Sequence, residues 1–92
     1  MRVRFALTWR GVEVRGIFDA RPLGNRRDRV WLRAEVPLFA DGDTMHVVWL
    51  GPLEMAPSPV ELSELAEVWL DEAAEDRGLH PDDIRRRQMS LF

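Results

Sequence analysis

The chain has 92 residues, of which 46% are hydrophobic and 32% are charged. A chain of this length supports one hydrophobic core rather than two, and the composition is that of a globular domain. The absence of Cys from the sequence excludes disulfides, thiolate metal sites and thiol nucleophiles. The first ten residues alternate charged and apolar side chains instead of forming a signal peptide, so we expect a cytoplasmic protein with no membrane segment.

The charge is unevenly distributed along the chain. All 13 basic residues are Arg, and the net charge is −3. Residues 1–50 hold nine Arg and six acidic residues (+3), whereas residues 51–92 hold four Arg and ten acidic residues (−6). The two halves are therefore expected to present surfaces of opposite charge.

Two segments near the start of the chain alternate apolar and polar residues. Apolar side chains occupy every second position from Val3 to Trp9, and the alternation resumes from Val12 to about Ala20. A period of two buries one face of a strand and leaves the other to solvent. Gly11 between the two segments suits a tight turn, so we expect a β-hairpin.

The segment from residue 21 to residue 29 combines turn-forming residues with four Arg and has no apolar period. It predicts a solvated loop, the most basic loop of the chain. Arg side chains bind phosphates through bidentate hydrogen bonds. Arg26, Arg27 and Arg29 are therefore possible DNA-contacting residues.

Two more strands follow in the sequence. Residues 30–38 restore the period of two, and Pro37 indicates that this strand lies at a sheet edge or stops there. Asp41-Gly42-Asp43 forms a turn that lacks the further ligands of a calcium loop. Residues 44–50, rich in Val and Trp, complete a predicted four-stranded antiparallel meander.

The clearest helix start lies at Ser58. This residue is the predicted N-cap, Pro59 takes the first helical position, and Glu61 completes a capping box. Acidic residues occupy one face of the following segment, and apolar residues recur at helical spacing on the other. The apolar residues are Leu62, Leu65, Ala66, Trp69 and Ala73.

Gly78 predicts a helix end in the left-handed conformation, with Leu79 folding back on the last turn. A second start at His80-Pro81 leads to a helix of only one or two turns. The predicted fold is therefore α+β: a four-stranded antiparallel meander packed by one amphipathic helix, a short second helix and an exposed tail. Residues 1–79 form the domain, and residues 80–92 form the short helix and the tail.

The last five residues of the sequence are Gln88, Met89, Ser90, Leu91 and Phe92. They resemble the sliding-clamp-binding motif of bacterial polymerases and repair factors, which reads Gln, Leu or Met, Ser or Asp, and Leu-Phe. The resemblance implies that Gln88 hydrogen-bonds in a polar-edged subsite and that Met89 lies against the groove. It also implies that Leu91 and Phe92 fill the clamp's apolar pocket. Met89, where Leu is commoner, is the one departure, and its unbranched thioether should fit.

The physical properties of the tail agree with this interpretation. Two large apolar side chains follow a run of three Arg at residues 85–87, and burial of each in a partner would contribute about 1.5–3 kcal/mol. The alternative is that Leu91 and Phe92 pack on the protein's own sheet. The sequence thus predicts a non-enzymatic adaptor or regulator, without a cofactor, that binds the bacterial DNA sliding clamp in replication or repair.

Two other functions stay open. One is a small nucleic-acid-binding β-domain that acts through an Arg-rich sheet and loop, and the other is an inhibitor or partner of another protein that uses the acidic helix. The Arg set of the first comprises Arg2, Arg4, Arg15, Arg26, Arg27 and Arg29.

The remaining chemistry-bearing residues receive structural interpretations. His46 falls in a predicted strand and His80 at a helix start, and no catalytic triad or metal constellation accompanies them. The four Trp residues would suit base stacking, but their positions in strands and on the helix's apolar stripe favour core packing. These are Trp9, Trp31, Trp49 and Trp69.

Overall fold

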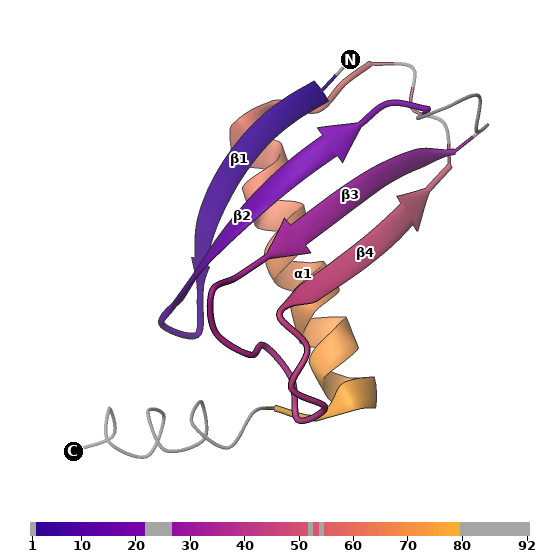
Figure 1. Cartoon of the computed structure of the whole chain (residues 1–92). Coiled ribbons are helices and arrows are strands. Elements are labelled where there is room, and N and C mark those ends of the chain that lie inside the picture. Colours follow the sequence, from indigo (N-terminus) through magenta and orange to yellow (C-terminus); the bar gives the residue numbers. More distant parts are fainter. Residues whose placement is uncertain (1, 22–26, 52, 54, 80–92) are drawn as a thin grey trace.

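The computed structural model describes residues 2–21, 27–51, 53 and 55–79. Four strands form one antiparallel sheet in the order β1-β2-β3-β4, and a helix crosses one of its faces (Figure 1). This confirms the α+β class and the four-stranded meander. The elements are β1 (Arg2–Trp9), β2 (Val12–Asp19), β3 (Asp28–Arg33), β4 (Met45–Leu50) and α1 (Pro59–Arg77). The predicted second helix and tail lie outside the described residues.

The first hairpin has the two-residue turn that the sequence predicts. Trp9 pairs with Val12 across the ladder, and Arg10 and Gly11 both have positive φ, at 52° and 78°. Positive φ at both central positions matches the right-handed twist of the flanking strands. Gly adopts positive φ readily. The two-residue turn fixes which residues of β1 and β2 pair, and so it sets the register of the whole β1–β2 ladder.

The core lies between the sheet and α1. Strands β1, β2 and β3 present alternate side chains to the helix, as their period of two requires. Phe5 and Gly16 are direct cross-strand partners on this face, and a Cβ atom at Gly16 would lie 2.1 Å from Phe5 Cζ. Gly16 thus makes room for the Phe5 ring. The other buried apolar strand residues are Trp9, Val12, Val14, Phe18, Val30 and Leu32.

The third strand is shorter at its end than the alternation over residues 30–38 indicates. β3 ends at Arg33, and although Ala34 N still donates to Thr44 O, the chain then leaves the ladder. Leu38 and Phe39 are adjacent and both buried in the core, so the period of two does not continue through this segment. The prediction of a strand to residue 38 was therefore wrong. Of the two interpretations of Pro37, the structure agrees with the second, because β3 stops before Pro37 and is a central strand rather than an edge strand.

The predicted loop over residues 21–29 is also too long. Asp28 and Arg29 belong to β3, where they pair with Leu50 and Trp49. Asp28 is only 2% exposed, and its carboxylate accepts hydrogen bonds from Arg21 N at 3.0 Å and Leu53 N at 2.9 Å. This buried carboxylate joins the segment that follows β2 to the segment that follows β4, and the apolar period gave no sign of it.

The start of α1 agrees with the sequence. Ser58 has an extended conformation, its Oγ accepts a hydrogen bond from Glu61 N at 3.2 Å, and Pro59 begins the helix. The buried stripe is rotated relative to the predicted one, because Leu65 is 42% exposed and Trp69 is only partly buried. Positions three and four apart still form the stripe, which consists of Leu62, Ala66, Leu70, Ala73 and Ala74.

Helix α1 ends just before Gly78, as predicted, but the backbone conformation of Gly78 differs from the predicted one. Gly78 has φ 79° and ψ 159°, so it has the positive φ but not the left-handed helical ψ. Leu79 is partly buried against the core. It forms an isolated β-bridge with Phe39, and Ala40 N donates to Gly78 O at 3.1 Å. Among the described residues, no helix is long and apolar enough to span a membrane.

Candidate functional site

The sequence-predicted clamp-binding residues, Gln88, Met89, Ser90, Leu91 and Phe92, lie outside the described residues, and so does Arg26. The described part of the chain contains two other groups of side chains with functional potential. One is the sheet face that α1 does not cover, and the other is an ionic cluster at the end of the helix.

We call the sheet face opposite α1 the open face. In Figure 1 no described element covers it. Its side chains alternate with the core residues along each strand, and most are exposed or half-buried. They form cross-strand rows, because the register aligns the four strands directly. The longest rows are Arg2–Asp19–Arg29–Trp49, Arg4–Ile17–Trp31–Val47 and Ala6–Arg15–Arg33–Met45.

An Arg and two Trp rings form the aromatic part of the open face. The guanidinium carbon of Arg29 lies 4.7 Å from the centroid of the Trp31 ring and 5.5 Å from that of Trp49. Arg29 Nη2 also donates to Asp19 Oδ2 at 3.2 Å, which fixes the guanidinium between the strands. Trp49 is 41% exposed. The cluster therefore presents ring and guanidinium planes at the surface. It lies on the edge strand β4 and on the neighbouring strand β3.

These positions correct two expectations. Core packing holds for Trp9, whose ring is buried, and Trp69 packs partly against the core. Trp31 and Trp49 instead lie on the open face, because the register places them with Arg29 and Arg33. Both residues were expected in the core only because they lie in strands. The alternation contained the signal, since Trp31 follows Val30 and precedes Leu32, both of which are buried.

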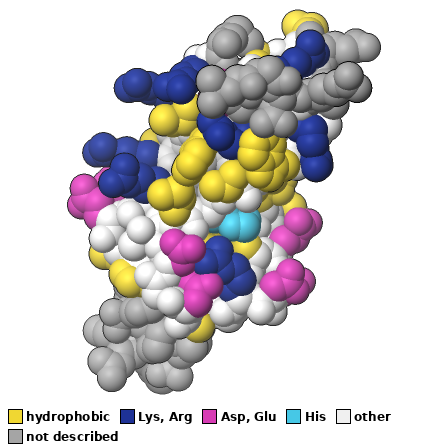
Figure 2. Space-filling model, turned by 45° about the vertical axis from the view of Figure 1, so that its right-hand side comes forward, with side chains coloured by type: hydrophobic (Ala, Val, Ile, Leu, Met, Phe, Trp, Pro, Cys, Tyr) yellow, Lys and Arg dark blue, Asp and Glu magenta, His cyan; other side chains and the backbone are white. Residues whose placement is uncertain are grey.

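The Arg side chains of the open face exceed its acidic ones. Arg2, Arg4, Arg15, Arg29 and Arg33 stand against Glu13 and Asp19, so five positive and two negative charges give +3. Figure 2 shows basic side chains bordering hydrophobic ones on the side that comes forward in that view.

Two of these Arg residues, Arg15 and Arg33, are direct cross-strand partners. Like charges directly opposite each other destabilise a sheet. Within the described ranges, neither of these two side chains nor that of Arg4 takes part in a hydrogen bond or ion pair. Arg2 and Arg29, by contrast, both pair with Asp19. The open face thus has a charge-balanced row beside a row of uncompensated positive charge.

Two of the possible DNA-contacting residues, Arg27 and Arg29, do not lie in one loop, although the sequence predicted that they would. Arg29 is a strand residue of the open face, whereas Arg27 precedes β3 and its Nη2 lies 3.5 Å from Trp49 O. Arg15 and Arg33 were missed as a pair, because only the strand register brings them together. Arg27 and Arg29 therefore flank the same Trp49, from the chain preceding β3 and from β3 itself.

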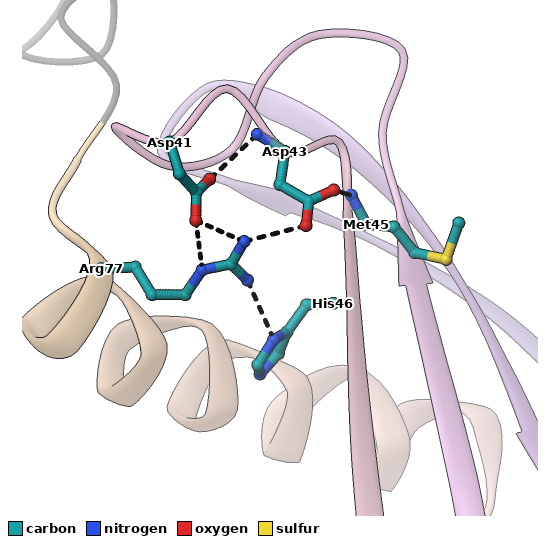
Figure 3. Close-up of polar contacts among 5 residues, drawn as sticks. All are labelled: Asp41, Asp43, Met45, His46 and Arg77. Atoms are coloured by element: carbon teal, nitrogen blue, oxygen red, sulfur yellow. Dashed lines mark hydrogen bonds and ion pairs between the residues drawn. The ribbon is translucent and has the colours of Figure 1, made fainter.

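The second group links the end of α1 to the segment before β4 (Figure 3). Arg77 Nη2 lies 2.6 Å from Asp41 Oδ2 and 2.9 Å from Asp43 Oδ2. Arg77 also lies over the Phe39 ring, with its guanidinium carbon 4.2 Å from the centroid. We call Asp41, Asp43, His46 and Arg77 the helix clasp.

The clasp shifts the ionisation of its members. The pKa of Asp41 is lowered by a hydrogen bond from Asp43 N and by Arg77, and that of Asp43 by a hydrogen bond from Met45 N and by Arg77. Burial and the Arg77 charge lower the pKa of His46, against the opposing effect of Asp43. Arg77 Nη1 lies 3.4 Å from His46 Nδ1, a contact that suits the neutral imidazole as acceptor.

The clasp has the geometry of a structural element. Its acidic residues are saturated by Arg77 and by backbone donors, as the hydrogen bonds of Figure 3 show. No group of three or more His, Cys, Asp or Glu side chains among the described residues is arranged to hold a metal ion. The open face, with uncompensated Arg and exposed Trp, is therefore the better candidate for ligand binding.

Comparison with protein families, with curated proteins and with solved structures gives no match for this chain. The function has to be argued from the residues of the chain itself.

Proposed function

We propose that this protein is a non-enzymatic adaptor or regulator that binds the bacterial DNA sliding clamp through Gln88–Phe92 in DNA replication or repair. The observation that carries the proposal is the pentapeptide itself. At average amino-acid usage, a match to a pattern this restrictive arises by chance roughly once in 10⁵ to 10⁶ positions.

The chemistry of the segment supports the proposal. Leu91 and Phe92 are large apolar side chains close behind the three Arg of residues 85–87, and an apolar pocket on a partner would remove both from water. The described domain has a core in which sheet and helix side chains bury one another. The proposal assigns Leu91 and Phe92 to a pocket on a partner instead of to this core.

Occupation of the clamp's pocket has two consequences for function. A protein that binds there brings its folded domain to the clamp, and it also competes with other proteins that carry the same motif. Recruitment and regulation are thus two results of one contact, and both are compatible with a domain that performs no chemistry.

The test compares clamp binding by the wild-type chain and by the double variant Leu91→Ala/Phe92→Ala, using calorimetry or surface plasmon resonance. The double substitution removes about 3–6 kcal/mol of apolar burial. A loss of that size takes a micromolar interaction beyond detection. Clamp binding that is unchanged in the double variant would disprove the proposal.

Two controls keep the result specific. A variant with the same five residues 88–92 in a different order keeps composition and charge, and it should also fail to bind the clamp. The thermal midpoints of wild type and both variants should agree, which separates loss of the motif from loss of the fold.

A further inference from the structure

The open face carries the exposed Trp49 ring and the partly buried Trp31 ring next to three Arg side chains that form no ion pair within the described chain. We propose that it binds single-stranded DNA, with bases stacking on Trp31 and Trp49 and phosphates contacting Arg4, Arg15 and Arg33. The choice of DNA over RNA rests on the proposed function, because a sliding clamp encircles DNA. The binding surface itself is argued from the geometry alone.

The bases would stack on the cluster around Arg29. Trp49 is 41% exposed on edge strand β4, and Trp31 lies on the neighbouring strand in the adjacent row. Arg29 holds a guanidinium near both rings, at 4.7 Å and 5.5 Å. Bases stack on aromatic rings and on guanidinium planes regardless of sequence. The cluster thus provides a platform for one or two bases.

Phosphates would contact the Arg side chains beside this platform, which form no ion pair in the described chain. Arg15 and Arg33 face each other across β2 and β3, and Arg4 lies in the row between them and Asp19. An anion placed between Arg15 and Arg33 would relieve their mutual repulsion, because each guanidinium donates paired hydrogen bonds to phosphate oxygens. A phosphate chain that crosses the sheet beside stacked bases matches both features.

Charge also excludes other occupants. A second copy packed face to face would bring its own Arg15 and Arg33 toward the same residues, and like charges would oppose that contact. Duplex DNA keeps its bases stacked on one another, so it cannot use the Trp platform. Single-stranded DNA offers both unpaired bases and phosphates.

The first experiment measures binding of fluorescein-labelled oligo(dT) to the full chain, without clamp, by anisotropy at low salt. Trp49→Ala should weaken binding about ten-fold, the effect of losing one stacked base, or about 1.4 kcal/mol. Val68→Ala is the matched control, because Val68 is 52% exposed on α1 and lies on the other side of the molecule. That control should leave the affinity unchanged.

The second experiment varies the salt concentration. The double variant Arg15→Gln/Arg33→Gln should reduce the slope of log K against log salt by about 1.4, or about 0.7 for each single-strand phosphate that Arg no longer neutralises. Arg10→Gln is the control for the loss of one Arg charge, since Arg10 lies outside the open face and forms an ion pair with Asp71 of the helix. It should leave the slope unchanged. Equal thermal midpoints would show that each variant is folded.

Four results would overturn the proposal. They are no binding of oligo(dT) by the wild type at low salt, equal binding by wild type and both open-face variants, duplex bound as tightly as the single strand, and self-association that the open-face variants abolish. Tighter binding of oligo(rU) than of oligo(dT) would overturn the choice of DNA. Since the clamp is absent from these measurements, their failure leaves the clamp proposal standing, and failure of the clamp test leaves them valid.

Discussion

At the scale of single residues, the most constrained positions are those where a close contact with another residue determines which side chain fits. Asp28 is buried, and its carboxylate accepts hydrogen bonds from two backbone N–H groups, those of Arg21 and Leu53. Gly16 is the reverse case, because the constraint there is the absence of a side chain beside Phe5. Both positions are decided by a contact with a residue that is distant in the sequence.

Gly16→Ala tests the second constraint. A Cβ atom 2.1 Å from the Phe5 ring forces the ring or the strand to move, so we expect a loss of about 1–3 kcal/mol in the free energy of unfolding. Urea denaturation followed by Trp fluorescence measures it. Gly51→Ala is the matched control, because a Cβ atom there has no neighbour within 4 Å. Equal stability of the two variants would show that Phe5 can be displaced at no cost.

At the scale of elements, α1 is fixed to the rest of the domain by polar contacts in its C-terminal half. Trp9 Nε1 donates to Asp71 Oδ1 at 2.9 Å, and Arg77 joins Asp41 and Asp43 at the last turn. Asp71 was expected on a solvated acidic face, yet it is an acceptor for a core Trp. The pairing of Leu79 with Phe39 adds a backbone bridge beside the clasp.

The clasp predicts a pH dependence of stability. The pKa of His46 is lower in the folded chain, so the unfolded chain takes up the proton first as pH falls through about 6.5. Stability should therefore be full above that pH and decrease as pH falls toward the folded pKa. His46→Gln should reduce the drop in thermal midpoint between about pH 7.5 and pH 5.

Two measurements complete the clasp test. NMR titration should place the pKa of His46 below its ordinary value in the wild type and move it upward in Arg77→Gln, since the Arg77 charge contributes to the lowering. An identical pH dependence in wild type and His46→Gln would show that the imidazole does not contribute. Both variants retain His80, so the comparison isolates His46.

At the scale of the whole molecule, charge is separated between the two layers. Helix α1 carries seven acidic residues and one Arg (−6), whereas the open face carries +3. A polyanion is therefore attracted to the sheet side and repelled from the helix side. The separation follows from the difference between the two halves of the sequence, which fold into different layers.

The domain should fold without residues 80–92. Truncation after Leu79 keeps the core, the clasp and the bridge to Phe39, so the thermal midpoint should shift by no more than about 4–8 °C, or about 1 kcal/mol. A chain that ends at Asp76 also lacks Arg77 and Leu79 and should lose clearly more. If the chain ending at Leu79 no longer unfolds cooperatively in a calorimetric scan, residues beyond it belong to the core.

The sequence by itself determined the features that depend on neighbours along the chain. The period of two placed β1 and β2, the turn chemistry at Gly11 placed the hairpin, and Ser58 and Pro59 placed the start of α1. Each is a local effect of backbone geometry or of a hydrogen bond between residues three apart. The clamp-binding interpretation of Gln88–Phe92 also comes from the sequence alone and stays a prediction.

Only the tertiary structure decided which distant residues meet. The inward face of each strand is fixed by contact with α1, so Trp31 and Trp49 could not be assigned to the open face from their identity as Trp. The end of β3 at Arg33 likewise could not be predicted from the apparent period of two, and beyond it Leu38 and Phe39 are both buried in the core. Arg15 meets Arg33 through strand register alone, and register is set by pairing between separate strands.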